Sequence, residues 1–219
     1  VPDLRAQIDF EVSSGRDRKT RLKNRVNQNV ARAIASLGAK DAVGDLIQLV
    51  DSPEPKTRDA VLRALGKLGA PDAAETMMDI AENDAEPFIR SVAIEALGEL
   101  KSPKAVPTLV KMLYAERGDG ISHYQEARFA LIRLGPQAVP ELMRTLERKN
   151  EAIEEMTVGG APLADGVIEA KAGSALGAMR VKDAEKPIVD ALQKYYNQWQ
   201  RQKSSAVNAS VLGAVIELT

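Results

Sequence analysis

"PEPKTRDAVLRALGKLGAPDAAETMMDI", residues 53–80, decides the fold of this chain. Its apolar residues recur at the spacing of one face of an α-helix, and Val61, Ala64, Leu65 and Leu68 form a narrow stripe on that face. The short turn GAPD follows, and a second periodic segment begins at Ala73. The stretch therefore predicts two helices joined by a tight turn, which is a helical hairpin.

The same hairpin recurs along the whole chain. The first helix of each copy ends on an anchor residue of the core, and the six anchors are Leu37, Leu68, Leu100, Leu134, Met179 and Val215. A second helix begins shortly after each of the first five anchors, at Ala42, Ala73, Ala105, Ala138 and Ala184. A unit of about 31 residues cannot bury its apolar face alone, so the copies must stack. The sequence thus predicts an all-α fold, a right-handed α-solenoid of about five full repeats with half-repeats at both ends.

At residues 53–80 the chain resembles the HEAT repeats of the short bacterial type that are called PBS-lyase HEAT-like repeats. The resemblance extends over nearly the whole chain and implies an armadillo-like helical array that supplies interaction surfaces. Phycobilin lyases share these repeats, and so do iron-dependent hydroxylases and DNA-repair glycosylases. The hydroxylases use paired His-Glu motifs, which this sequence lacks, and the glycosylases need a basic groove, which its acidic second helices fit poorly.

We expect a single array over 1–219. Its predicted parts are a partial repeat (1–15), full repeats (16–51, 52–84, 85–117, 118–150 and 163–203), an inter-repeat insertion (151–162) and a second partial repeat (204–219). Neither half-repeat shows the polar cap that a terminal repeat needs, which suggests a piece of a longer protein. Degenerate native caps are the alternative.

Composition narrows the classes of partner and chemistry. The formal net charge of −1 argues against a general nucleic-acid binder, and no apolar run is long enough to span a membrane, so we expect a soluble protein. The absence of cysteine excludes disulfides, thiolate catalysis and cysteine-ligated metal. It is compatible with the bacterial cytoplasm or periplasm and does not choose between them.

No motif indicates catalysis. His123 is the only histidine, and the run Ser122–Gln125 is typical of a capping box that opens a helix. The glycines of "GGAPLADG" (159–166) lack the spacing of a phosphate-binding loop, and we interpret this segment as a flexible connection. The sequence therefore predicts no catalytic residue, no metal site and no cofactor, and a protein that is not an enzyme.

The predicted function is a non-catalytic scaffold or adaptor. It would hold a protein or peptide in an acidic concave groove formed by the second helices and along the edge where the inter-repeat loops lengthen. The candidate partner-binding residues are Asp45, Glu75 and Asp79 of the groove, Gly159 and Gly160 of the insertion, and Tyr196, Trp199 and Arg201 of the last long helix. The alternatives are an accessory or lyase-type subunit that acts on a prosthetic group, as phycobilin lyases do, and a nucleic-acid-binding HEAT protein.

Two features stay open at this level. The basic stretch Arg16–Arg32 is either a solvated outer helix or a contact for an acidic protein partner. In "KYYNQWQRQK" (194–203) Tyr195 continues the core stripe of its helix. Trp199 either packs on the insertion, against Ile153, Met156 or Leu163, or stands exposed as an anchor.

Overall fold

The computed structural model describes residues 2–11, 13–116 and 118–202, with the side chain of Trp199 excepted. The chain divides into two compact units, residues 1–105 and 106–219, and each is described by itself. The predicted half-repeat at 204–219 lies outside the described residues, so the predicted boundaries of the array stay predictions.

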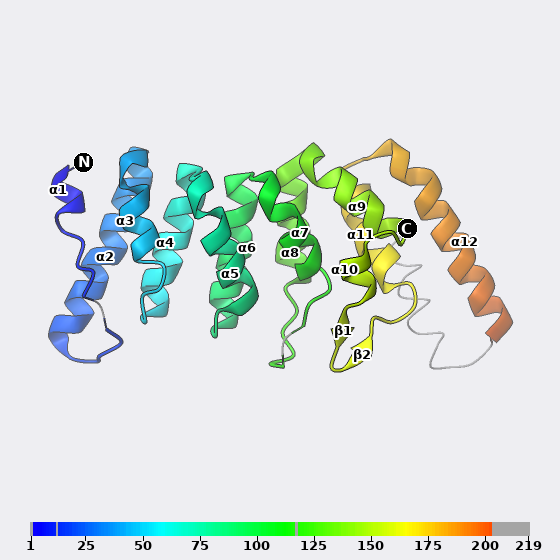
Figure 1. Cartoon of the computed structure of the whole chain (residues 1–219), viewed down its shortest axis with the longest axis horizontal. Helices are drawn as coiled ribbons and strands as arrows, with labels where there is room; N and C mark the ends of the chain where they lie inside the picture. Colours follow the sequence, from blue (N-terminus) through cyan, green and yellow to red (C-terminus); the bar gives the residue numbers. More distant parts are fainter. Residues whose placement is uncertain (1, 12, 117, 203–219) are drawn as a thin grey trace. The chain divides into compact units, whose positions relative to one another are not determined.

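The first unit is built from two layers of helices. Its helices are α1 (Pro2–Arg5), α2 (Arg18–Leu37), α3 (Val43–Gln48), α4 (Pro55–Leu68), α5 (Ala74–Asn83) and α6 (Pro87–Leu100) (Figure 1). The short 3-10 turns η1 (Lys40–Ala42), η2 (Pro71–Ala73) and η3 (Pro103–Ala105) follow α2, α4 and α6. Helices α2, α4 and α6 pack on one another as the first layer, and α3 and α5 pack on them as the second.

Helix α4 shows why these sequences form such layers. Glu54 caps its first turn by accepting a hydrogen bond from the backbone N–H of Thr57, and Pro55 occupies the first helical position, where a missing N–H costs little. Its fully buried Val61 and Leu65 face the core. A Cβ added at Gly66 would lie 3.1 Å from the backbone of Ala96 on α6, so the two helices approach through small residues, as the narrow stripe predicts.

The second unit keeps this pattern and adds an insertion to it. Its helices are α7 (Val106–Met112), α8 (Tyr124–Leu134), α9 (Val139–Leu146), α10 (Glu151–Glu154), α11 (Val167–Ala178) and α12 (Glu185–Gln202). The turns η4 (Gly135–Ala138) and η5 (Lys182–Ala184) precede α9 and α12, and strands β1 (Thr157–Val158) and β2 (Ala161–Pro162) lie between α10 and α11 (Figure 1).

The predicted hairpin turns are confirmed in both units. The five alanines expected to open the second helices each end a 3-10 turn instead of starting the α-helix itself, and each is 0% exposed: Ala42, Ala73, Ala105, Ala138 and Ala184. The fold class is accordingly the all-α solenoid of stacked helical hairpins that the repeats predict.

The anchor predicted for the first repeat is wrong. Leu37 is 64% exposed, whereas the equivalent Leu68 and Leu134 are buried. The last buried residues of α2 are Ile34 (0% exposed) and Ala35 (7%). Periodicity defines the apolar face of a helix, but burial also needs a neighbour that covers the face, and no residue of α1 is buried.

The insertion contains a short β-hairpin, which the sequence analysis did not predict. Strands β1 and β2 pair antiparallel, with Val158 opposite Ala161. Gly159 and Gly160 form the turn between them with φ of 61° and 82°. Two consecutive positive φ angles are the requirement of a type I′ hairpin turn, which glycine meets without strain.

The predicted capping box at the start of α8 is also wrong. The helix begins at Tyr124, and its N-cap residue His123 makes no side-chain cap bond. Ser122 accepts a hydrogen bond from the backbone N–H of Tyr124 (3.3 Å) and pairs with Glu116 in an isolated bridge. His123 is buried, 4% exposed. Among the described helices, none has the length and apolar character to cross a membrane.

Candidate functional site

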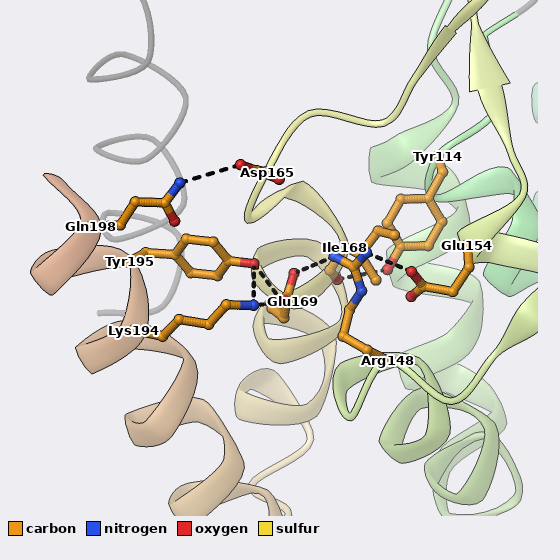
Figure 2. A network of polar contacts seen from close by, with 9 residues as sticks. All are labelled: Tyr114, Arg148, Glu154, Asp165, Ile168, Glu169, Lys194, Tyr195 and Gln198. Atoms are coloured by element: carbon orange, nitrogen blue, oxygen red, sulfur yellow. Dashed lines mark hydrogen bonds and ion pairs between the residues drawn. The ribbon is translucent and has the colours of Figure 1, made fainter. Parts of the chain in front are cut away.

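The second unit buries an acidic side chain, Glu169, in the first turn of α11. Glu169 is 2% exposed. The hydroxyl of Tyr195 donates to its Oε1 (2.5 Å), Arg148 Nη1 donates to its Oε2 (3.2 Å), and Lys194 Nζ lies 3.5 Å from Oε1. Figure 2 shows Lys194 and Tyr195 reaching this carboxylate from α12, and Arg148 reaching it from the opposite side.

Glu169 and Arg148 form an ion pair in which each charge lies at the helix end that stabilises it. Glu169 lies in the first turn of α11, where the helix dipole favours a negative charge, and Arg148 follows the last turn of α9, where it favours a positive one. Arg148 has φ of 60°, a left-handed conformation that costs a residue with a side chain about 1–2 kcal/mol. Its guanidinium contacts offset that cost, and the conformation aims the side chain at Glu169.

Arg148 also ties the insertion to the array. Its Nη2 donates to Glu154 Oε2 on α10 (2.5 Å), while Glu154 Oε1 is buried without a hydrogen-bond partner in the described part of the chain. On α12, Gln198 Nε2 donates to Asp165 Oδ2 in the segment after β2 (3.3 Å; Figure 2). The insertion is therefore held against α11 and α12 by polar side chains.

A buried tyrosine supports α11 from the other side. Tyr114 is 1% exposed, and its hydroxyl donates to the backbone carbonyl of Ile168 (2.9 Å; Figure 2). Lys171 Nζ donates to the carbonyl of Leu113 (2.8 Å) and lies 5.7 Å from the ring centre of Tyr114 and 5.0 Å from that of Tyr124. These contacts fix the start of α11, and with it the backbone that carries Glu169.

Burial and neighbouring charges raise the pKa values of Tyr195, Tyr114 and Arg148. Burial raises the pKa of Tyr195, and the hydrogen bond to Glu169 and the charge of that carboxylate raise it further. Burial also raises the pKa of Tyr114, with Glu169 adding to the shift. Burial opposes the charge of Arg148, but the hydrogen bond to Glu154 and the negative charge of Glu169 raise its pKa overall. Tyr195 therefore acts as a hydrogen-bond donor to Glu169 and is not a base.

A pocket of about 370 Å³ opens beside this network. It is lined by Leu146, Glu147, Arg148, Glu169, Pro187, Asp190, Ala191 and Lys194. Two of its acids are paired at the rim, Glu147 with Lys149 (2.5 Å) and Asp190 with Lys186 (2.6 Å). The side chain of Lys194 is 60% exposed; its Nζ donates to the hydroxyl of Tyr195 (3.2 Å) and lies 3.5 Å from Glu169 Oε1. The pocket thus combines apolar walls with an accessible ammonium group.

The sequence carried a pattern that could have located this site. Each described first helix has a buried residue at the centre of its apolar stripe: Ile34, Leu65, Leu97, Leu131 and Leu176. The residue seven positions before it is polar each time: Asn27, Arg58, Arg90, Tyr124 and Glu169. Asn27 bonds the backbone of Asp9 through its Nδ2 (2.8 Å), and Arg58 bonds Ser52 O (2.8 Å), so this position ties the preceding connection to the helix. Only Glu169 places an acid there.

The predicted acidic groove residues lie in the first unit and have internal partners. Asp45 on α3 forms an ion pair with Arg5. On α5, Glu75 lies 3.7 Å from Lys104, and Asp79 accepts a hydrogen bond from Asn83 Nδ2 (2.8 Å). Their predicted role in binding stays a prediction.

The remaining candidate residues lie in the second unit. Gly159 and Gly160 form the tip of the hairpin, and Tyr196 on α12 is 46% exposed. Arg201 lines a second pocket of about 450 Å³ together with Lys194, Asn197 and Gln198. The side chain of Trp199, whose role as core or anchor was left open, lies outside the described residues. The predicted core position of Tyr195 is confirmed at 2% exposure.

Over the residues that the structure covers, no group of three or more histidine or acidic side chains is arranged to hold a metal ion.

Comparison with known proteins agrees with this repeat architecture. Residues 21–98 match the family model of HEAT repeats, and residues 89–114 match that of the PBS lyase HEAT-like repeat. Residues 21–114 therefore consist of HEAT repeats, with the PBS lyase HEAT-like type matched at 89–114, as the sequence predicts.

No curated protein matches the chain. Among solved structures, the complex of CpcE and CpcF of phycocyanin lyase from Nostoc sp. PCC7120 is similar to it at 19% sequence identity and a TM-score of 0.48, covering 100% of this chain and 95% of that one. A likeness at this level carries no functional argument.

The prediction that the chain is not an enzyme is contradicted. The match of residues 89–114 to the PBS lyase repeat points to a lyase-type subunit. Sequence reasoning tied catalysis to a nucleophile or a metal motif within one chain. A subunit of a lyase need not show either one, because its part in the reaction can be to hold and orient a group.

Proposed function

We propose that this protein is a lyase-type or accessory subunit that binds one end of a prosthetic group, carried to or from a protein partner. The observation that supports this most directly is the pocket beside Glu169, which joins apolar walls to the ammonium group of Lys194. An open-chain tetrapyrrole has matching parts, since its rings are apolar and its propionates pair with a cation. The PBS lyase repeat at 89–114 supports the same class.

The residues of the pocket fit such a group in part. A volume of about 370 Å³ lies towards the small end of ligand sites, so the pocket suits one end of the group and leaves the rest to a partner protein. Leu146, Pro187 and Ala191 would cover ring surface. Lys194 would orient a propionate, while Glu169 holds Lys194 in place.

The chain's own residues assign it a holding role. It contains no cysteine, so it offers no thiol for attachment of the group to itself. Tyr195 and Arg148 hold the Glu169 carboxylate in place by hydrogen bonds, and Glu169 in turn faces the ammonium group of Lys194. When bound, the prosthetic group supplies the reactive double bond system; the protein supplies orientation and exclusion of water.

Biliverdin tests the proposal. Titrating the full chain with this tetrapyrrole should give a saturable change in its visible absorbance, and Lys194→Gln should weaken binding by about tenfold through loss of a charge-assisted hydrogen bond. Lys182→Gln is the matched control, because Lys182 is exposed in the turn before α12 and does not line the pocket. Biliverdin dimethyl ester should bind the wild type as weakly as biliverdin binds Lys194→Gln. Absence of a saturable change, or equal affinities of the two variants, would rule the proposal out.

A further inference from the structure

The first unit contains a separate pocket whose lining is strongly basic. It has a volume of about 390 Å³ and is lined by Ser14, Gly15, Arg16, Arg21, Asn24, Arg25, Gln28, Glu54 and Lys56. Arg21, Asn24, Arg25 and Gln28 lie three or four residues apart on α2, which places them on one face of that helix. The loop before α2 and the first turn of α4 close the pocket.

Within the described part of the chain, the four cations of the pocket have no carboxylate partner. Arg16, Arg21, Arg25 and Lys56 take part in no ion pair there, whereas Arg5, Arg58 and Arg63 of the same unit do. The acids nearby are occupied. Glu54, the only acid of the lining, accepts from Thr57 N (2.9 Å) and from Gln28 Nε2 (3.2 Å). Asp17 accepts from Thr20 N (2.9 Å) as the cap of α2. The positive charge is therefore concentrated around one hollow and is not neutralised within it.

Asn24 adds a buried polar group to the lining. It is 4% exposed, and its Nδ2 donates to the carbonyl of Ser13 (3.1 Å), which fixes which way the amide points. Its Oδ1 has no hydrogen-bond partner in the described chain. A buried acceptor without a partner is costly, and a water that hydrates a bound anion would satisfy it, whereas the oxygens of the anion are themselves acceptors and would not.

The loop is built to stay close to the helix. A Cβ added at Gly15 would lie 3.0 Å from Asp17 Oδ2 and 3.3 Å from Thr20 Oγ1, so the loop passes close to the side chains of the first turn of α2. Ser13 Oγ also accepts from Gly15 N (3.4 Å). The wall that carries Arg16 is thus held at the mouth of the pocket.

We propose that this pocket binds a small polyvalent oxyanion of the phosphate class. Three guanidinium forks and an ammonium group match an anion with several charged oxygens better than a single carboxylate, because each fork can pair two oxygens. Nucleic acid fits less well, because it needs a basic track along the surface. The chain as a whole has a net charge of −1, and acidic residues lie on η1 (Asp41), α3 (Asp45) and η2 (Asp72) of this unit. The volume is that of a site for a small ligand.

Calorimetric titration of the full chain with pyrophosphate at low ionic strength tests the proposal. Saturable binding at one site is expected, and it should weaken at least about tenfold in the double variant Arg21→Gln, Arg25→Gln, because two charge-assisted contacts are lost. The double variant Arg32→Gln, Lys67→Gln makes the same change of net charge on α2 and α4, the two helices that line the pocket, but outside it, and it should bind as the wild type does. The side-chain amide resonances of Asn24 and Gln28 should shift during the titration.

Three other anions, each titrated in the same way, test whether the pocket prefers another class of ligand to a phosphate-class oxyanion. Succinate represents dicarboxylates, hexaglutamate represents acidic protein segments, and a short single-stranded oligonucleotide represents nucleic acid. The proposal is overturned if pyrophosphate fails to bind saturably, if both double variants weaken it equally, or if any of the three other anions binds more tightly than pyrophosphate. These results are independent of the biliverdin titration, which probes residues of the second unit.

Discussion

Arg58 in the first unit and Glu169 in the second occupy the same position of the repeat but carry opposite charges. Arg58 donates to both carboxylate oxygens of Asp84 at 2.8 Å and to Ser52 O, all within the connections between helices. Glu169 accepts from Arg148 and Tyr195 and adjoins the pocket that contains Lys194. In the first unit, the side chain at this position bonds the connections before and after its hairpin. In the second unit, the carboxylate at this position is contacted by Tyr195 of α12 and by Arg148, which also bonds Glu154 of the insertion.

The helix dipole explains why a carboxylate can replace a guanidinium at this position of the repeat. An acid at this position lies in the first turn of a helix, where the dipole stabilises a carboxylate and disfavours a guanidinium. The arginine of the earlier repeats therefore needs acceptors from the loops, and the glutamate needs cations from other elements. Meeting that need brings Arg148 into a left-handed conformation and Lys194 to the pocket edge.

The largest effect is expected from Arg148→Met. This substitution leaves Glu169, whose side chain is 3% exposed, with Tyr195 and a distant ammonium, and it should lower the free energy of unfolding by about 3 kcal/mol. Urea denaturation measures the change. Arg144→Met is the control, since its ion pair with Glu141 is 56% exposed on the arginine side and should contribute less than about 0.5 kcal/mol. Equal losses in the two variants would contradict the importance of the buried acid.

Arg58→Met should have a smaller effect, about 2 kcal/mol. Asp84 is left without its guanidinium, but it still accepts a hydrogen bond from the backbone N–H of Glu86 (2.9 Å). Arg63→Met, which removes exposed ion pairs of the same helix, should change stability by less than about 0.5 kcal/mol. If Arg58→Met destabilises more than Arg148→Met, the inverted charge is not the more demanding arrangement.

Alkaline pH should weaken the second unit selectively through Tyr195. Its pKa is raised above the ordinary value of 10.0, first by burial and then by Glu169. The unfolded chain therefore loses this proton first, so the stability due to Tyr195 is fully present below about pH 10 and declines above it, by at most about 1.4 kcal/mol per pH unit. Urea midpoints measured between neutral pH and pH 11 should fall less steeply for Tyr195→Phe. Parallel curves for the two proteins would contradict the raised pKa of Tyr195. All four tyrosines lie beyond residue 105, so no tyrosine of the first unit titrates in this range.

The smallest effects concern two glycines at one repeat position, and they should have opposite signs. Gly66→Ala places a Cβ 3.1 Å from the backbone of Ala96 and should lower stability by about 1 kcal/mol, because the backbone cannot move aside. At Gly177 no described atom lies within 4 Å of an added Cβ, so Gly177→Ala should raise stability by about 0.5–1 kcal/mol through helix propensity alone. Thermal unfolding compares the pair. The same sign for both would mean that the close approach of α4 and α6 is not limiting.

The fold could be predicted from the sequence because the same helical-hairpin pattern recurs in each repeat. The apolar spacing of residues 53–80 predicts two helices, and five buried alanines confirm where the second helices turn. Leu37 shows the limit of this reasoning, since its spacing is that of a core residue but its burial depends on a neighbour. The candidate site was much less readable. Tyr195 was predicted as core, but its hydroxyl partner Glu169 and the cation Arg148 come from two other elements.

The sequence by itself determined the repeating unit, because the period of apolar residues is a local property that defines which face of each helix must be covered. It also contained the change from Arg58 and Arg90 to Glu169, and the pair of glycines that forms the turn of the hairpin. Only the tertiary structure decided which charges meet. Glu169 is joined to Arg148 and Tyr195 across 21 and 26 residues of chain, and Arg21 and Lys56 line one pocket from two helices. Such contacts depend on packing distances between elements, and no local pattern of residues encodes those distances.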